Sequence, residues 1–173
     1  MDVTISRATE SDWHIIESVF ADAVERQKNE NPLTRWTADT IKRENLMPDF
    51  GIECFSIAYV EGKPAGVIAI TDENSYVYPD IPKGKSLFIR WLAVKQEFAK
   101  AKISTRLIDY AKDMCTTQYL PLLLEIQRIR KVQEFYLSHG FRICGKFFDK
   151  RTPALLQQLI WDGDNLVSNA TGS

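Results

Sequence analysis

The chain has 173 residues, of which 45% are apolar and 26% are charged, a balance typical of a globular protein with one buried core. Lysines and arginines are spread along the chain and the formal net charge is -1, which argues against a nucleic-acid-binding surface. The sequence contains neither a basic and apolar leader nor an apolar run long enough to span a membrane. We therefore expect a soluble, cytoplasmic protein.

The sequence has few residues of the types that build disulfides or metal sites. Cys54, Cys115 and Cys144 are odd in number and far apart, as expected for thiols in a reducing compartment. The two histidines, His14 and His139, lie on predicted helices at surface-like positions, and a metal site needs more ligands than these. No metal is expected, and Cys115 and Cys144 are interpreted as small core residues rather than nucleophiles.

The first half of the chain is predicted to form a strand, two helices and an antiparallel hairpin. Alternating apolar residues indicate strands, and apolar residues three or four positions apart indicate helices. The predicted elements cover residues 3–5, 9–24, 37–48, 54–60 and 65–71. Thr9 is the predicted N-cap of the first helix, with Asp12 as the capping carboxylate. The loop at 72–85 is long for a hairpin connection and is expected to border a binding cleft.

The second half is predicted to contain a strand–helix–strand unit followed by a short helix and two strands. The predicted elements cover residues 87–94, about 102–114, 122–126, 131–139, 141–147 and 155–161. The whole order predicts an α/β fold with a mixed, mostly antiparallel sheet flanked by helices on both faces. We expect residues 1–161 to form one domain and residues 162–173 to form a poorly ordered polar tail.

A candidate anion site lies where the predicted central strand runs into the next helix. Leu92, Ala93 and Val94 end this strand, and the helix begins near Lys102. Such a junction directs backbone N–H groups and the positive end of a helix dipole into one space, which suits a pyrophosphate. Lys100 and Lys102 would add positive charge there, although an ordinary turn with solvated lysines would have the same residues.

Two segments of the sequence resemble motifs of the GNAT superfamily of N-acetyltransferases. Leu-Ala-Val at 92–94 and the residues after it resemble the acetyl-CoA motif, in which a strand is followed by Arg/Gln-x-x-Gly-x-Gly/Ala and a helix. On that pattern Ala99 takes the Arg/Gln position, Lys102 the first glycine and Ser104 the last. The segment 134–141 resembles the later helix of the family, which ends in Tyr, a few residues and Gly-Phe. The resemblance covers residues 3 to about 161.

The resemblance implies that backbone groups bind the acyl donor. The strand end would pair with the pantetheine arm, and the loop amides would hold the pyrophosphate. The cofactor-binding residues implied in this way are Leu92, Ala93, Val94, Ala99, Lys100, Ala101, Lys102, Ile103, Ser104 and Thr105. Lys102 and Ser104 each add a Cβ where the family has glycine, so cofactor binding could be weaker or altered.

The resemblance also implies a catalytic tyrosine. Tyr136 would protonate the departing thiolate, whereas helical spacing alone would suggest a core aromatic residue. Glu125, near the end of the strand at 122–126, could orient water or substrate, or could equally pair with Arg90 or Arg128. The loop at 72–85 and the helical pair near Trp36 are expected to select the acceptor.

We therefore expect an acetyl-CoA-dependent N-acetyltransferase of the GNAT-like acyl-CoA N-acyltransferase fold. It would move an acetyl group to the amine of a small molecule or peptide by direct attack in a ternary complex, without a metal. The alternative is a non-catalytic regulatory module that binds an acyl-CoA or another metabolite. No nucleic-acid or membrane partner is expected, a homodimer is left open, and no motif specifies the acceptor amine, the acyl chain or the general base.

Overall fold

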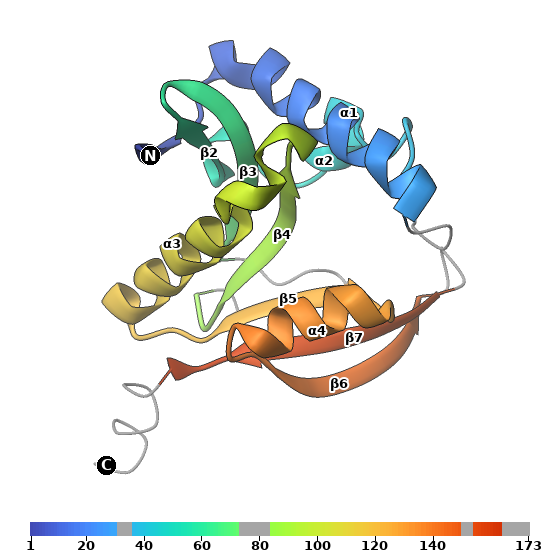
Figure 1. Ribbon diagram of the computed structural model, residues 1–173. Coiled ribbons are helices and arrows are strands. Elements are labelled where there is room, and N and C mark those ends of the chain that lie inside the picture. Colours follow the sequence, from blue (N-terminus) through green and yellow to red (C-terminus); the bar gives the residue numbers. More distant parts are fainter. Residues whose placement is uncertain (31–35, 73–83, 150–153, 164–173) are drawn as a thin grey trace. The chain divides into compact units, whose positions relative to one another are not determined.

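The computed structural model describes residues 1–30, 36–72, 84–149 and 154–163 (Figure 1). These residues form two compact units, one containing residues 1–70 and 90–107 and the other residues 71–89 and 108–173. Strand β4 (Leu87–Val94) and helix α3 (Ile103–Gln118) therefore contribute residues to both units. Residues 73–83 of the predicted loop and residues 164–173 of the predicted tail lie outside the described residues. The single domain expected for residues 1–161 stays a prediction.

The elements follow one another in the predicted order, with short 3-10 helices between them. The other strands are β1 (Val3–Arg7), β2 (Phe55–Val60), β3 (Lys63–Thr71), β5 (Leu122–Gln127), β6 (Arg142–Asp149) and β7 (Ala154–Trp161). The other helices are α1 (Trp13–Glu30), α2 (Arg43–Leu46) and α4 (Arg130–Ser138), and the 3-10 helices are η1 (Glu10–Asp12), η2 (Ile52–Cys54) and η3 (Gln96–Ala101).

The strands are arranged in the order β1-β2-β3-β4-β5-β7-β6. The pairs β1–β2, β2–β3, β5–β7 and β6–β7 are antiparallel, whereas β4 and β5 are parallel and are joined through α3. A parallel pair requires such a crossover connection, while neighbouring antiparallel strands can be joined by a short turn. The mixed, mostly antiparallel sheet predicted from the sequence is therefore confirmed.

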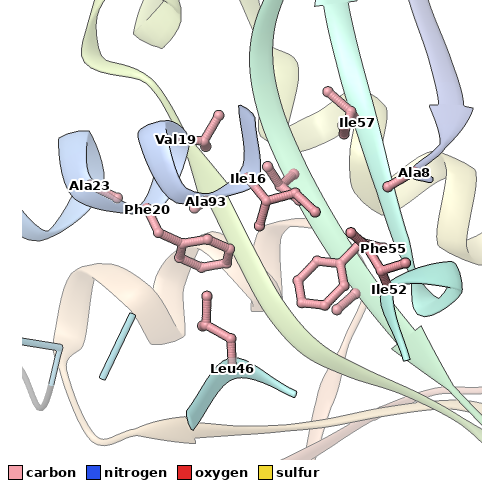
Figure 2. Close-up of a cluster of buried hydrophobic side chains, with 12 residues drawn as sticks. Ala8, Ile16, Val19, Phe20, Ala23, Leu46, Ile52, Phe55, Ile57 and Ala93 are labelled. Carbon is pink, nitrogen blue, oxygen red and sulfur yellow. The ribbon is translucent and has the colours of Figure 1, made fainter. Parts of the chain in front are cut away.

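The core of the first unit is formed by α1 against β2 and β3 (Figure 2). Ile16, Phe20 and Ala23 recur at helical spacing on α1, and all three are buried. The remaining members of this cluster of buried side chains are Ala8, Val19, Leu46, Ile52, Phe55, Ile57, Val67, Ala69 and Ala93. The apolar face that the sequence predicts for α1 is thus the face that packs on the sheet.

The other face of β3 is covered by the first turn of α3. Val67 faces the α1 core, and successive strand residues point to opposite faces, so Gly66 faces the other way. A Cβ on Gly66 would lie 2.9 Å from Cγ2 of Ile103 and 3.1 Å from the carbonyl oxygen of Ala93. The missing side chain therefore allows α3 to approach β3 closely, and the first unit has helices on both faces of its strands.

The second unit is built around β5, β7 and β6, with the beginning of β4 beside β5. Leu87 is the partner of Leu122 in the parallel pair, and Trp161 of β7 is the antiparallel partner of Leu122. Helix α4 lies against β5 (Figure 1). In the part of the chain that the structure describes, no helix has both the length and the apolar character needed to cross a membrane.

Candidate functional site

The end of β4 is buried and bonded to β3. Ala93 and Val94 are buried and Leu92 is half-buried. The backbone N–H of Lys95 donates to the carbonyl oxygen of Ala65 at 2.9 Å, so bonding between these two segments continues one residue past β4. The strand end predicted to bind the pantetheine arm is thus held in place by its neighbour in the sheet.

The segment between β4 and α3 is a 3-10 helix that ends in an unusual backbone conformation. Lys102, the last residue before α3, has φ 54° and ψ 33°, which is the left-handed region. This region favours glycine and costs other residues about 1 kcal/mol or more. Lys102 is the residue that takes the first glycine position of the GNAT motif. The lysine at this position therefore adopts a backbone conformation that glycine adopts without strain.

Helix α1 restrains this segment through side chains that sequence reasoning missed. The Asp22 carboxylate accepts a hydrogen bond of 2.7 Å from the backbone N–H of Gln96, at the start of η3. The guanidinium of Arg26 donates to Oε1 of Gln96 at 3.4 Å. These residues are 74 and 70 positions apart in the sequence, and no motif links them.

The segment expected to help select the acceptor packs onto the α1 core. The rings of Trp36 and Trp91 are 5.6 Å apart, and each lies within 6 Å of the ring of Phe20. The indole N–H of Trp91 donates to the carbonyl oxygen of Leu46 at 2.9 Å, which attaches α2 to β4. Trp91 directly precedes Leu92, so this aromatic cluster adjoins the predicted cofactor strand.

Tyr136 lies on α4 and is 7% exposed. Its ring meets those of Phe135 and Phe141 edge-on, at centroid distances of 5.0 and 5.5 Å. Its carbonyl oxygen accepts hydrogen bonds from the N–H groups of His139 and Phe141, which anchor the end of α4. Burial raises the pKa of the Tyr136 phenol above its ordinary value, so this side chain keeps its proton near neutral pH.

Glu125 is half-buried on β5, opposite Gln158 on β7. Leu122 is the partner of Trp161, and Glu125 is three residues further along, so its side chain points to the face of the sheet opposite Trp161. Glu125 and Tyr136 belong to the second unit, whereas all of the predicted cofactor residues belong to the first. The structure thus brings the predicted cofactor residues together in the first unit.

A lysine that sequence reasoning missed connects three elements of the second unit. Nζ of Lys112 on α3 donates to the carbonyl oxygen of His139, the residue after α4. It also lies 5.2 Å from the ring centroid of Trp161 and 5.9 Å from that of Phe141. Burial lowers the pKa of Lys112. These contacts hold α4 close to α3, the helix that begins at the cofactor segment.

Cys115 and Cys144 do not provide an activated nucleophile. Cys115 is buried, as predicted, whereas Cys144 is exposed, so the prediction that Cys144 is a core residue is wrong. Burial raises the pKa of the Cys115 thiol to about 12, and partial desolvation also raises the pKa of the Cys144 thiol. A thiol with a raised pKa is protonated near neutral pH and is a weak nucleophile. Among the described residues, no three His, Cys, Asp or Glu side chains are placed to hold a metal ion.

Several solved structures resemble this chain. Ard1 from Thermoplasma volcanium aligns with a TM-score of 0.65 and 19% identity, over 93% of this chain and 97% of that one. The ribosomal-protein-S18-alanine N-acetyltransferase from Escherichia coli aligns with a TM-score of 0.64 and 15% identity, over 95% and 99%. PaiA N-acetyltransferase from Thermoplasma acidophilum, solved in complex with coenzyme A, aligns with a TM-score of 0.67 and 16% identity, over 91% and 98%. At these identities the likeness shows a shared fold.

The sequence itself gives the family. No curated protein matches the chain. The sequence profile of the acetyltransferase (GNAT) domain matches residues 20–152, which include β4, the segment after it, α3 and α4. A match over most of the chain, together with the shared fold, identifies the family of this protein. The chain belongs to the GNAT acetyltransferase family.

Proposed function

We propose that this protein is an acetyl-CoA-dependent N-acetyltransferase that acetylates an amine of a small molecule or peptide. The observation that carries the proposal is the junction of β4 and α3, where Lys102, at the position of the first motif glycine, adopts the left-handed conformation that favours glycine. A similar protein, PaiA from Thermoplasma acidophilum, was solved in complex with coenzyme A. The thiols of Cys115 and Cys144 fit a reducing compartment, and we place the activity in the cytoplasm.

In this proposal the first unit binds the acyl donor. The backbone of Leu92, Ala93 and Val94 pairs with the pantetheine arm, and the segment 99–105 holds the pyrophosphate. Gly66 supports this arrangement of the pyrophosphate segment, because its missing side chain lets the first turn of α3 lie close to β3. Backbone N–H groups near Leu92 or Val94 polarise the thioester carbonyl, the kind of electrostatic term that contributes most in acyl transfer.

Tyr136 is the proposed proton donor. The substrate amine attacks the thioester carbonyl carbon in one ternary complex, so that a C–N bond forms and the C–S bond breaks. Tyr136 gives its proton to the departing thiolate, a role that its raised pKa suits because the phenol stays protonated. Glu125 takes the proton from the amine, directly or through water. The products are the N-acetylated amine and free coenzyme A.

Turnover with a panel of amines tests the proposal. The panel contains a polyamine, a free amino acid, a peptide with a free N-terminus and a peptide with an internal lysine, and mass spectrometry detects the acetylated product. Tyr136→Phe is expected to lower kcat about 100-fold with the amine that reacts best. Tyr59→Phe is the matched control, because the Tyr59 phenol also has a raised pKa, but Tyr59 is only partly buried and lies on β2. We expect its kcat to stay within about twofold of the wild type.

Binding of acetyl-CoA without acetylation of any amine in the panel would contradict the enzymatic proposal. It would favour the alternative, a regulatory module in which replacement of the motif glycines has abolished turnover. Equal kcat values for the wild type and Tyr136→Phe would remove Tyr136 from the mechanism and leave the acetyltransferase activity in place.

A further inference from the structure

The last turn of α4, which carries Tyr136, is capped by a lysine from another helix. Nζ of Lys112 on α3 donates to the carbonyl oxygen of His139, which directly follows α4 and is 27 positions away in the sequence. The last carbonyl groups of a helix have no partner within the helix, and a cation is favourable at this negative end of the helix dipole. Helix ends fray easily, so this hydrogen bond restrains the turn that contains Tyr136.

The same ammonium lies near an aromatic ring that packs on Tyr136. Nζ of Lys112 is 5.9 Å from the ring centroid of Phe141, and the Phe141 ring meets the Tyr136 ring edge-on at 5.5 Å. The backbone gives a second connection, because the N–H groups of His139 and Phe141 both donate to the carbonyl oxygen of Tyr136, at 3.0 and 3.2 Å. Lys112 therefore contacts two residues that each contact Tyr136.

This position is costly for a lysine. Lys112 is half-buried, and its Nζ lies 5.2 Å from the ring centroid of Trp161, so part of the hydration of the ammonium is lost. Methionine would pack a similar unbranched stem against the rings without burying a charge. Methionine cannot donate a hydrogen bond to the His139 carbonyl oxygen, however. The cost of the lysine is explained if the end of α4 has to be held in place.

We propose that Lys112 is a positioning residue that holds the phenol of Tyr136 in the orientation required for proton transfer. This role rests on the proposed function, in which Tyr136 is the proton donor. Lys112 acts through the end of α4 and through the Phe141 ring, and not on the reacting atoms. A displacement of about 1 Å at a reacting group can lower the rate about 100-fold. The loss of Lys112 should therefore lower kcat and leave KM nearly unchanged.

Two substitutions separate the hydrogen bond of Lys112 from its packing. Lys112→Met keeps an unbranched stem and removes the donor, whereas Lys112→Arg keeps a charged donor. Lys131→Met, at an exposed lysine of α4, is the matched control. Lys112→Met is also combined with Tyr136→Phe. For each variant, kcat and KM are measured with the amine that reacts best, at a temperature at which circular dichroism shows the variant to be folded.

We expect Lys112→Met to lower kcat by about five- to twentyfold with KM within about twofold of the wild type, and Lys112→Arg to recover most of the loss. In the Tyr136→Phe protein, the same methionine substitution should change kcat by less than about twofold, because the hydroxyl that Lys112 positions is already absent. A general loosening of the fold would lower kcat by the same factor in both backgrounds. Lys131→Met should match the wild type.

Fluorine NMR of protein labelled with 3-fluorotyrosine reports the environment of the Tyr136 ring without turnover. The chain has six tyrosines, and the signal that is missing from Tyr136→Phe belongs to Tyr136. This signal should shift or broaden in Lys112→Met, since the end of α4 has lost its cap. It should keep its wild-type position in Lys131→Met.

The outcomes separate this role from the proposed function. If the wild type acetylates an amine and Lys112→Met lowers kcat equally with and without the Tyr136 hydroxyl, the positioning role is wrong and the acetyltransferase proposal stands. An unchanged Tyr136 signal in Lys112→Met would contradict the positioning role in the same way. If the wild type acetylates no amine of the panel, the proposed function fails and the positioning role fails with it.

Discussion

At the scale of single residues, Tyr136 combines its proposed catalytic role with a measurable effect on stability. Its phenol is buried between aromatic rings, and burial raises its pKa from the ordinary value of 10.0. Between that value and the higher pKa of the folded state, the unfolded chain has released the phenol proton and the folded chain still holds it. The free energy of unfolding therefore falls as pH rises through this window.

We predict that Tyr136→Phe weakens this alkaline loss of stability. Urea unfolding at about pH 8 and about pH 11 measures it, and the difference between the two pH values should be smaller for the variant than for the wild type. Tyr59 also has a raised pKa and remains in both proteins, so the comparison isolates Tyr136. An identical pH dependence in the two proteins would mean that the phenol is not buried.

Local sequence signals identified contacts between residues close together in the chain and could not identify contacts between distant ones. Thr9 was predicted as an N-cap with Asp12 as its partner, and the Asp12 carboxylate accepts the Thr9 N–H at 2.8 Å. That pair is three residues apart, whereas the bond between Asp22 and Gln96 joins α1 to η3 across 74 residues. The conformation of Lys102 was equally hidden, because lysine has no preference for the left-handed region.

At the scale of elements, the close packing of α3 on β3 depends on one glycine. We predict that Gly66→Ala lowers the free energy of unfolding by about 1–3 kcal/mol, since the added methyl group would meet Ile103 and the Ala93 carbonyl oxygen. Urea denaturation measures the change. Affinity for acetyl-CoA should fall as well, because the first turn of α3 must move.

Gly145→Ala provides the control for that change. Gly145 also lies on a strand, but its added methyl group would be 3.5 Å from Oε1 of Gln158, an ordinary contact distance. We expect this variant to stay within about 0.5 kcal/mol of the wild type. A loss of stability as large as that of Gly66→Ala would show that the cost comes from alanine in a strand and not from the approach of α3.

The order of the elements was predictable and the order of the strands was not. Apolar periodicity is a local property, so it revealed each main helix and strand as well as the parallel β4–α3–β5 unit. The position of β7 between β5 and β6 depends on pairing between distant segments, such as Leu122 with Trp161. Nothing in either strand's own sequence specifies such a partner.

At the scale of the whole molecule, we predict that the two compact units unfold in one cooperative transition. Strand β4 and helix α3 each run from one unit into the other, so neither unit can unfold without disrupting an element of its partner. Trp13, Trp36 and Trp91 belong to the first unit and Trp161 to the second. Fluorescence of a Trp161→Phe variant therefore reports the first unit alone.

The thermal midpoint from that fluorescence should equal the midpoint from far-UV circular dichroism, which reports both units. Urea unfolding of the same variant should give the same coincidence of the two probes. Two separate midpoints would contradict the single domain predicted for residues 1–161 and would identify the unit that unfolds first.

The left-handed lysine before α3 also limits which residues the junction accepts. Because Lys102 has φ 54° and ψ 33°, glycine and asparagine fit this position with little strain, whereas a β-branched residue there would be strained. The junction therefore constrains the backbone more tightly than it constrains the side chain.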